Sequence, residues 1–134
     1  MTQHRSKSYQ HASPEKLRKV PSAFWKTVHA KSGRVILVYI VDGAWIRQNI
    51  DVGWIGGGHG LIDKYIPANT IWLERGFSKP DLLAFLVHEL HEYDLMEAGG
   101  DYEKAHEAAN EVEAAYRRSV LKERRAKVKT EGDL

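Results

Sequence analysis

The side chains best suited to chemistry lie at residues 87–92, where the sequence reads V-H-E-L-H-E. On a helix, residues four apart share a face, so His88 and Glu92 can approach one metal ion. His91 lies about 60° and Glu89 about 100° from His88 around such a helix, so Glu89 could border the site without binding the ion. The flanking residues are apolar on nearly every side, and burying polar side chains among them is unfavourable unless they are paired or bind a metal.

A third candidate ligand, His106, comes from the next predicted helix. Gly99-Gly100 is a strong helix stop and predicts an antiparallel hairpin, which places position 92 opposite about position 107. His106 would then lie close to the level of Glu92. Two ligands from one helix and one from the next leave a position open to water, as in catalytic zinc sites. Because the chain has no cysteine, such a site must use histidine and carboxylate ligands.

This motif resembles the H-E-x-x-H signature of the zincin metallopeptidases, with Glu92 in place of the second histidine. The resemblance implies that His88, Glu92 and His106 bind zinc and that Glu89 is the catalytic general base. It also implies a strand before the motif helix, here at residues 71–73, and a second helix after it. A carboxylate ligand lowers the net charge on the ion and weakens the activation of water. We expect a zinc-dependent hydrolase of the peptidase type that acts on a peptide or protein substrate.

A second resemblance is to small uncharacterised proteins of phages and prophages, and it covers residues 38–116. It rests on five motifs, which are D-G-x-x-I-R at residues 42–47, G-G-H at 57–59, Y-I-P-x-x-x-I-W at 65–72, H-E-L-x-E-x-x-L-M at 88–96 and Y-x-x-A-H-x-x-A-N at 102–110. The resemblance implies a phage-type origin but no particular activity. The position of His91 varies in this pattern, which favours Glu92 as the metal ligand.

The net charge of +2 conceals three segments of different charge. Residues 1–35 carry +7, residues 36–116 carry −9 and residues 117–134 carry +4. An acidic middle segment that holds four of the seven histidines favours a metal or acid/base site over a phosphate-binding surface. The sequence has no long apolar run and no signal-like start, so we expect a cytoplasmic protein, in the host cell if phage-encoded, without a membrane contact.

The remaining sequence predicts a single α+β domain at residues 13–120, between a disordered tail at 1–12 and a basic tail at 121–134. This domain comprises an N-terminal helix, a small β-sheet and a C-terminal helical hairpin that carries the zincin-like motif. The expected elements begin with a helix from Ser13, an apolar helical stripe at 24–28 and a central strand at 34–41. A turn at Asp42-Gly43 leads to a second strand at 44–47, which is followed by a glycine-rich loop at 51–65 and an edge strand at 70–74. The motif helix then runs up to Ala98, and a last helix begins at Asp101 and frays beyond Val120.

Two other functions remain open from the sequence alone. His88, Glu92 and His106 could form a metal-free hydrogen-bonded cluster, or hold a structural metal, in a non-enzymatic phage accessory protein. The basic segments 1–35 and 117–134 could instead bind nucleic acid. His59 is expected to be a simple loop histidine, although it could approach a substrate or an ion. The other notable side chains are expected to be structural: an outer partner or exposed residue at His91, surface charge at Glu103, Glu107 and Glu111, and packing aromatics at Trp45, Trp54 and Trp72.

Overall fold

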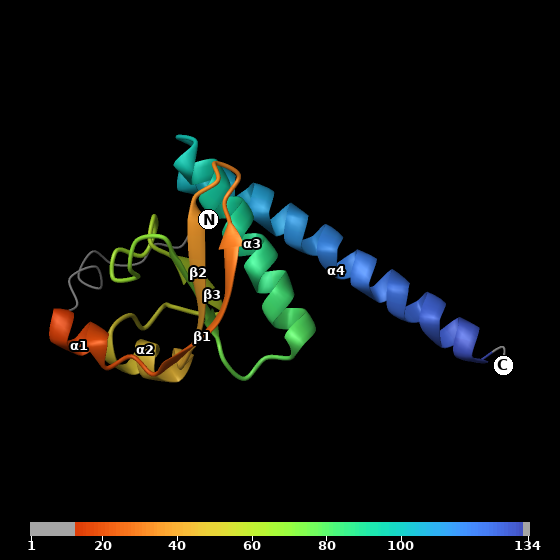
Figure 1. Cartoon of the computed structure of the whole chain (residues 1–134), viewed down its shortest axis with the longest axis horizontal. Helices are drawn as coiled ribbons and strands as arrows, with labels where there is room; N and C mark the ends of the chain where they lie inside the picture. The colour runs from red at the N-terminus through yellow and green to blue at the C-terminus, as the bar shows by residue number, and fades with distance from the viewer. Residues whose placement is uncertain (1–12, 133–134) are drawn as a thin grey trace.

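Two parallel strands, β2 (Val35–Val41) and β4 (Thr70–Glu74), form the centre of the sheet in the computed structural model, which describes residues 13–132 (Figure 1). β1 (Ser22–His29) pairs antiparallel with β2, and β3 (Gly57–His59) pairs antiparallel with β4. The strand order is therefore β1-β2-β4-β3. The helices complete the predicted α+β fold, and they are α1 (Pro14–Arg18), α2 (Gly43–Asn49), α3 (Lys79–Glu97) and α4 (Tyr102–Gly132).

Alternating side chains of β2 and β4 face two separate cores, one on each side of the sheet. The core toward α3 consists of Ala30, Ile36, Val38, Ile71, Leu73, Leu86 and Tyr93. The core toward α2 consists of Val41, Ile46, Ile50, Trp54, Tyr65, Ile66 and Trp72, with Trp45 packed at its border. All five residues of β4 are buried, because the strand has a neighbour on each edge and a core on each face. The prediction that Trp45, Trp54 and Trp72 are packing residues is confirmed.

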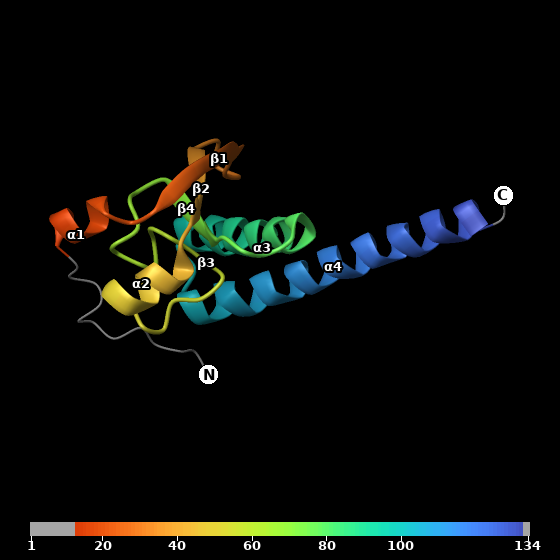
Figure 2. The same ribbon diagram turned by 90° about the horizontal axis from the view of Figure 1, so that it is seen from below.

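The two C-terminal helices form the predicted hairpin. The side chain of Ser78 caps α3 by accepting a hydrogen bond from the N–H of Asp81. After the cap residue Ala98, Gly99 adopts a φ of 103°, a left-handed conformation that glycine tolerates, and the chain reverses. α3 lies against the sheet, and the first half of α4 packs along α3, while the second half extends away from the domain (Figure 2). The hairpin thus brings residues of two helices next to the sheet.

Two segments before residue 50 differ from the predicted elements. Residues 24–28 belong to strand β1, not to a helix, because the segment pairs with β2 along its length, with a bulge between Phe24 and Lys26. Its aromatic and β-branched residues suit a strand once this partner is present. Residues 44–47 lie in helix α2, not in a strand. The side chain of Asp42 accepts a hydrogen bond from the N–H of Trp45, so this residue begins a helix instead of a hairpin turn.

The strand at residues 70–74 is internal, which corrects the predicted edge position. β3 pairs with its outer side, and β3 lies within the segment 51–65 that was predicted as an irregular loop. Glycine allows this close packing, since a Cβ on Gly58 would collide with the side chains of Asp63 and Trp54. A short glycine-containing strand therefore forms the edge of the sheet and contacts α3.

The C-terminal helix is longer than predicted. α4 continues as a regular helix to Gly132 instead of ending near Val120, and its last turns are rich in Lys, Arg and Glu, which have high helix propensity. The side chains at residues 121–129 are exposed, and the segment is basic as expected. The tail predicted at residues 1–12 lies outside the described residues. None of the helices between residues 13 and 132 combines the length and the apolar composition that a membrane span requires.

Candidate metal centre

α3 places three of the predicted site residues side by side. The helical spacing puts His88 and Glu92 on one face, where His88 Nε2 lies 3.4 Å from Glu92 Oε2. Glu89 borders this pair, with its Oε2 4.0 Å from His88 Nε2. The exposed fractions of His88, Glu89 and Glu92 are only 7%, 8% and 2%. Carboxylates buried to this degree need compensating hydrogen bonds or charges.

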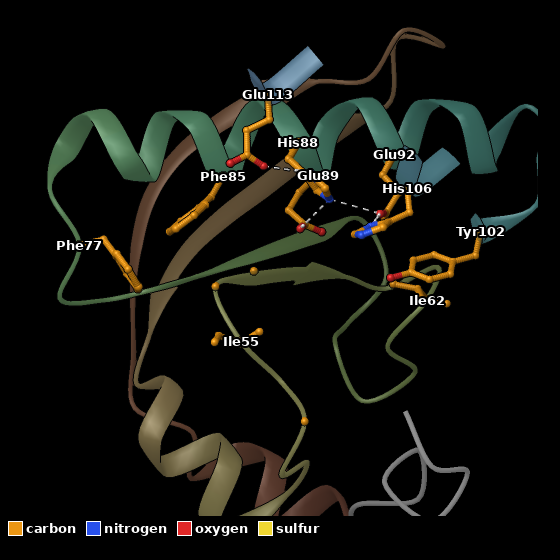
Figure 3. Close-up of a pocket in the computed structure, with 13 residues that line it drawn as sticks. Ile55, Ile62, Phe77, Phe85, His88, Glu89, Glu92, Tyr102, His106 and Glu113 are labelled. Atoms are coloured by element: carbon orange, nitrogen blue, oxygen red, sulfur yellow. Dashed lines mark hydrogen bonds and ion pairs between the residues drawn. The ribbon is translucent and has the colours of Figure 1, made fainter. Parts of the chain in front are cut away.

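α4 supplies the third predicted ligand (Figure 3). His106 lies across the hairpin from Glu92, and its Nδ1 is 2.8 Å from Glu92 Oε2. The His106 ring stacks on Tyr102 with centroids 5.3 Å apart and meets the His88 ring edge-on at 4.9 Å. Ligand atoms of His88, Glu92 and His106 all lie within 4.8 Å of one another. The fold therefore brings together the three side chains that the sequence singled out as metal ligands.

The sheet adds a fourth side chain to the cluster. His59, at the end of β3, is fully buried, and its Nε2 lies 2.8 Å from Glu92 Oε1. Ligand atoms of His59, Glu89 and Glu92 form a second group within 4.8 Å. The expectation of an ordinary loop histidine is therefore wrong. The sequence feature that could have indicated this role is the position of His59 directly after Gly57-Gly58. Glycine lets β3 approach α3 closely, since a Cβ on Gly57 would come within 3.2 Å of Glu89 Cγ.

Glu113 of α4 is a further carboxylate of the site, and it was not among the residues expected to form it. Its Oε1 lies 3.1 Å from Nδ1 of His88, a buried nitrogen that has no aligned hydrogen-bond partner among the described residues. Arg117 donates from Nε to Glu113 Oε2 at 3.0 Å and from Nη1 to Asp81 at 2.7 Å, which holds Glu113 beside His88. The sequence feature that could have indicated a role for Glu113 is its spacing of seven residues from His106, which places both side chains on one face of α4.

Glu92 carries the negative charge at the centre of the cluster. Burial by itself would raise the pKa of Glu92, but the hydrogen bonds with His59, His88 and His106 together outweigh burial and hold the pKa far below its ordinary value of 4.5. The carboxyl group is therefore ionised at neutral pH. An ionised carboxylate surrounded by imidazoles can accept hydrogen bonds from these rings, or it can bind a cation together with them.

The cluster forms one wall of an open pocket with a volume of about 580 Å³ (Figure 3). The glycine-rich segment at residues 53–57 borders the pocket across from α3. Apolar side chains extend it, and two of them, Ile55 and Phe77, are 70% and 40% exposed. A molecule in solvent can therefore reach Glu89 and the cluster past an apolar rim.

The residues present fit a divalent transition-metal ion. Two imidazoles and one carboxylate from facing helices are a donor set that zinc uses in proteins. Nδ1 of His88 has Glu113 beside it, and a carboxylate next to the second ring nitrogen is typical of metal-binding histidines. His91 is half-buried and belongs to neither group of ligand atoms. The carboxylates predicted as surface charge are exposed, and they are Glu103, Glu107 and Glu111.

Comparison of the chain with known protein families, with curated proteins and with solved structures finds no match in any of the three.

Proposed function

We propose that the protein is a metal-dependent hydrolase in which His88, Glu92 and His106 bind a zinc ion. The observation that carries this proposal is the convergence of the three ligand atoms within 4.8 Å, beside the buried carboxylate of Glu89, in the wall of an open pocket. Three protein ligands leave a coordination position for water or substrate, as in catalytic zinc sites. The resemblance to the zincin motif supports the same assignment.

Glu89 is the group best placed to move a proton. A bound zinc ion would supply Lewis-acid chemistry, since it polarises a carbonyl group and makes water easier to deprotonate. Glu89 borders the ligand set, 4.0 Å from His88 Nε2, and lines the pocket. Its carboxylate would accept a proton as the oxygen of a water molecule adds to the carbonyl carbon. The same group would deliver that proton to the leaving amine as the C–N bond breaks.

The position of β3 supports a peptide as the substrate. β3 is the edge strand of the described sheet, and its first residue, Gly57, lines the pocket together with Glu89. A sheet edge can pair with an extended peptide through its backbone N–H and C=O groups. In β3 the N–H of Gly57 already donates to Ile55 and the C=O of His59 accepts from Asp63, so a peptide would pair only with the remaining groups of this edge. A peptide paired with β3 would cross the pocket, where Ile55 and Phe77 offer contact to an apolar side chain. The substrate class that we propose is therefore an extended peptide with an apolar residue near the cleaved bond.

The proposal is tested by measuring zinc content and peptide hydrolysis on the same samples. Wild-type protein should bind one zinc ion per chain, and His88→Ala should lose it, because an imidazole ligand is removed. Glu89→Gln should retain zinc but lose hydrolysis of a fluorogenic peptide library, because an amide cannot accept the proton. Glu107→Gln, at an exposed position of α4, is the matched control and should retain both properties. Wild-type protein that binds no zinc would contradict the proposal.

A non-enzymatic accessory protein is the second candidate. It is favoured by the hydrogen bonds that already satisfy Glu92, at Oε1 with His59 and at Oε2 with His106. This cluster could hold the hairpin on the sheet without a metal or with a structural one. Glu89→Gln would then change no property. His106→Ala would lower the melting temperature equally with and without zinc if the cluster is metal-free, and more strongly with zinc if the metal is structural. The resemblance to phage and prophage proteins supports either candidate, acting in the cytoplasm of a host cell.

The projecting part of α4 favours a third candidate, nucleic-acid binding. Residues 117–132 contain seven basic and two acidic residues, and the side chains at 121–129 are exposed. Figure 1 shows this part of the helix extending beyond the domain. A basic helix in solvent can contact phosphate groups. Replacing Lys122, Arg125 and Lys129 by Gln should then weaken duplex DNA binding and reduce its salt dependence, whereas affinity that does not change with salt would exclude this candidate.

A further inference from the structure

We propose that His59 is a positioning residue whose Nε2–H holds Oε1 of Glu92, so that only Oε2 of this carboxylate is left for a metal ion. The inference rests on the proposed metal centre at His88, Glu92 and His106 and adds to it a residue of the sheet. It also sets the number of ions at one per chain, although His59, Glu89 and Glu92 have the spacing of a second ligand set.

The hydrogen bond that His59 accepts defines its proton position. The backbone N–H of Leu61 donates to His59 Nδ1 at 3.2 Å. A ring nitrogen that accepts a hydrogen bond carries no proton, so the proton of the neutral ring lies on Nε2. Nε2 faces Glu92 Oε1 at 2.8 Å, and His59 is therefore the donor of this hydrogen bond. A doubly protonated ring would point Nδ1–H at the N–H of Leu61.

The same proton position argues against His59 as a metal ligand. To bind an ion through Nε2, the ring would have to release the Nε2 proton while Nδ1 still accepts from Leu61, which would leave a buried imidazolate. The alternative, a proton on Nδ1, would break the hydrogen bond with Leu61. The second group of ligand atoms therefore contains a histidine whose ring nitrogens are both already engaged.

The surroundings of His59 keep its ring in this orientation. The side chain is fully buried, and its backbone pairs with Ile71 of β4. Its ring meets the Tyr93 ring edge-on, with centroids 5.5 Å apart and planes at 83°. The N–H of Asp63 donates to the carbonyl oxygen of His59 at 3.0 Å, which orders the turn that contains Leu61. A donor held this rigidly fixes the carboxylate that it contacts.

The two oxygens of Glu92 consequently have different roles. Oε1 is engaged by the sheet through His59, while Oε2 lies 2.8 Å from His106 Nδ1 and 3.4 Å from His88 Nε2. Oε2 is thus the oxygen that shares a site with both proposed imidazole ligands. Without the donor on His59, Oε1 would be buried without its hydrogen bond, and the carboxylate could rotate or bind an ion through both oxygens. Loss of such an outer partner typically lowers metal affinity by about 10- to 100-fold.

The test compares two substitutions of His59 with Co²⁺ as the probe, because the visible absorption of bound Co²⁺ reports its coordination. His59→Gln keeps an amide donor for Glu92 but has no imidazole, and it should bind one Co²⁺ per chain with nearly wild-type affinity and spectrum. His59→Leu removes the donor, so it should bind Co²⁺ about 10- to 100-fold more weakly, with an altered spectrum. His91→Gln, which changes a half-buried histidine outside both ligand groups, is the control and should behave like wild type.

The possible outcomes separate this inference from the proposed function. Two Co²⁺ ions per wild-type chain, with one lost in His59→Gln, would overturn it, because His59 would then be a ligand. Equal Co²⁺ affinity for folded His59→Leu and wild type would overturn it as well. If circular dichroism shows that His59→Leu does not fold, His59→Gln decides alone, since a donor role requires that it retain Co²⁺. Wild-type protein that binds no Co²⁺ would overturn the metal centre itself.

Discussion

At the scale of single residues, the two ring nitrogens of His88 face two different carboxylates. Nε2 faces Glu92 at 3.4 Å, and Nδ1 faces Glu113 at 3.1 Å without an aligned hydrogen bond. If Nε2 of His88 binds the metal ion, the ring proton lies on Nδ1. The carboxylate of Glu113 is close enough to accept a hydrogen bond from this Nδ1–H. Glu113 is therefore the outer partner of His88 in the proposed centre, as His59 is the outer partner of Glu92.

Removing the carboxylate of Glu113 should weaken metal binding. We expect Glu113→Ala to lower zinc affinity by about 10-fold, because His88 loses the acceptor that selects its ligating tautomer. Glu113→Gln, which keeps an acceptor oxygen, should lose less affinity. Glu107→Ala on the exposed side of α4 is the control. Competition with a chromophoric chelator measures the affinities, and an unchanged value for Glu113→Ala would show that the contact has no part in metal binding.

At the scale of elements, local signals predicted the helical hairpin and the two central strands of the sheet, but not its outer strands β1 and β3. The Ser78 cap, the four-residue spacing of His88 and Glu92 and the stop at Gly99 act within a few residues, so α3 and its ligands follow from the sequence. β1 and β3 depend on pairing with strands distant in sequence, which no local pattern specifies. His59 was misjudged for this reason, because its role depends on the pairing of β3 beside α3.

A side chain at Gly58 of β3 should destabilise the fold. Gly58→Ala should lower the free energy of unfolding by about 1–3 kcal/mol, because the added Cβ collides with Asp63 and Trp54 in a tightly packed edge strand. Gly53→Ala, in the same segment, is the control, since its Cβ would meet only Asp51 at an ordinary contact distance of 3.5 Å. Urea denaturation measures both variants. Equal stability of the two would show that β3 can move away from its neighbours without loss.

The ion pair that joins α2 to β4 should make stability depend on acidic pH. Arg47 donates to both oxygens of Glu74, at 3.0 and 2.8 Å, and these hydrogen bonds lower the pKa of Glu74 below its ordinary value of 4.5 against the opposing effect of burial. Because the folded pKa is the lower one, the stabilisation is complete above pH 4.5 and is lost as pH falls through the folded pKa.

Glu74→Gln tests this pH dependence. At pH 7 the variant should be less stable than wild type by about 2 kcal/mol, since hydrogen bonds to a charged group are replaced by weaker ones. The difference should shrink as the pH falls below 4.5, where wild-type Glu74 becomes protonated. Urea unfolding at several pH values measures this, with Glu103→Gln at an exposed position as the control. A difference that stays constant with pH would contradict the assignment.

At the scale of the whole molecule, α4 has two parts in different environments. Its first half carries His106 and Glu113 and packs on α3, with Ala105 and Ala109 buried in the contact. Its second half extends into solvent (Figure 2), where Leu121 and Val128 are 49% and 66% exposed. Only the first half of α4 therefore contributes to the proposed metal centre, and the second half is available to contact another molecule.

The two parts of α4 should differ in hydrogen exchange. A helix segment with few tertiary contacts is only marginally stable, so amides at residues 121–132 should exchange by local opening, orders of magnitude faster than those at residues 84–93 of α3, which open only with the core. Exchange followed by mass spectrometry at several protein concentrations measures this. Protection at 121–132 that rises with concentration would mean that a second copy of the chain covers the projecting helix. Protection that appears only when duplex DNA is added would instead support the nucleic-acid candidate, because the basic side chains of this segment would then be engaged by phosphate groups.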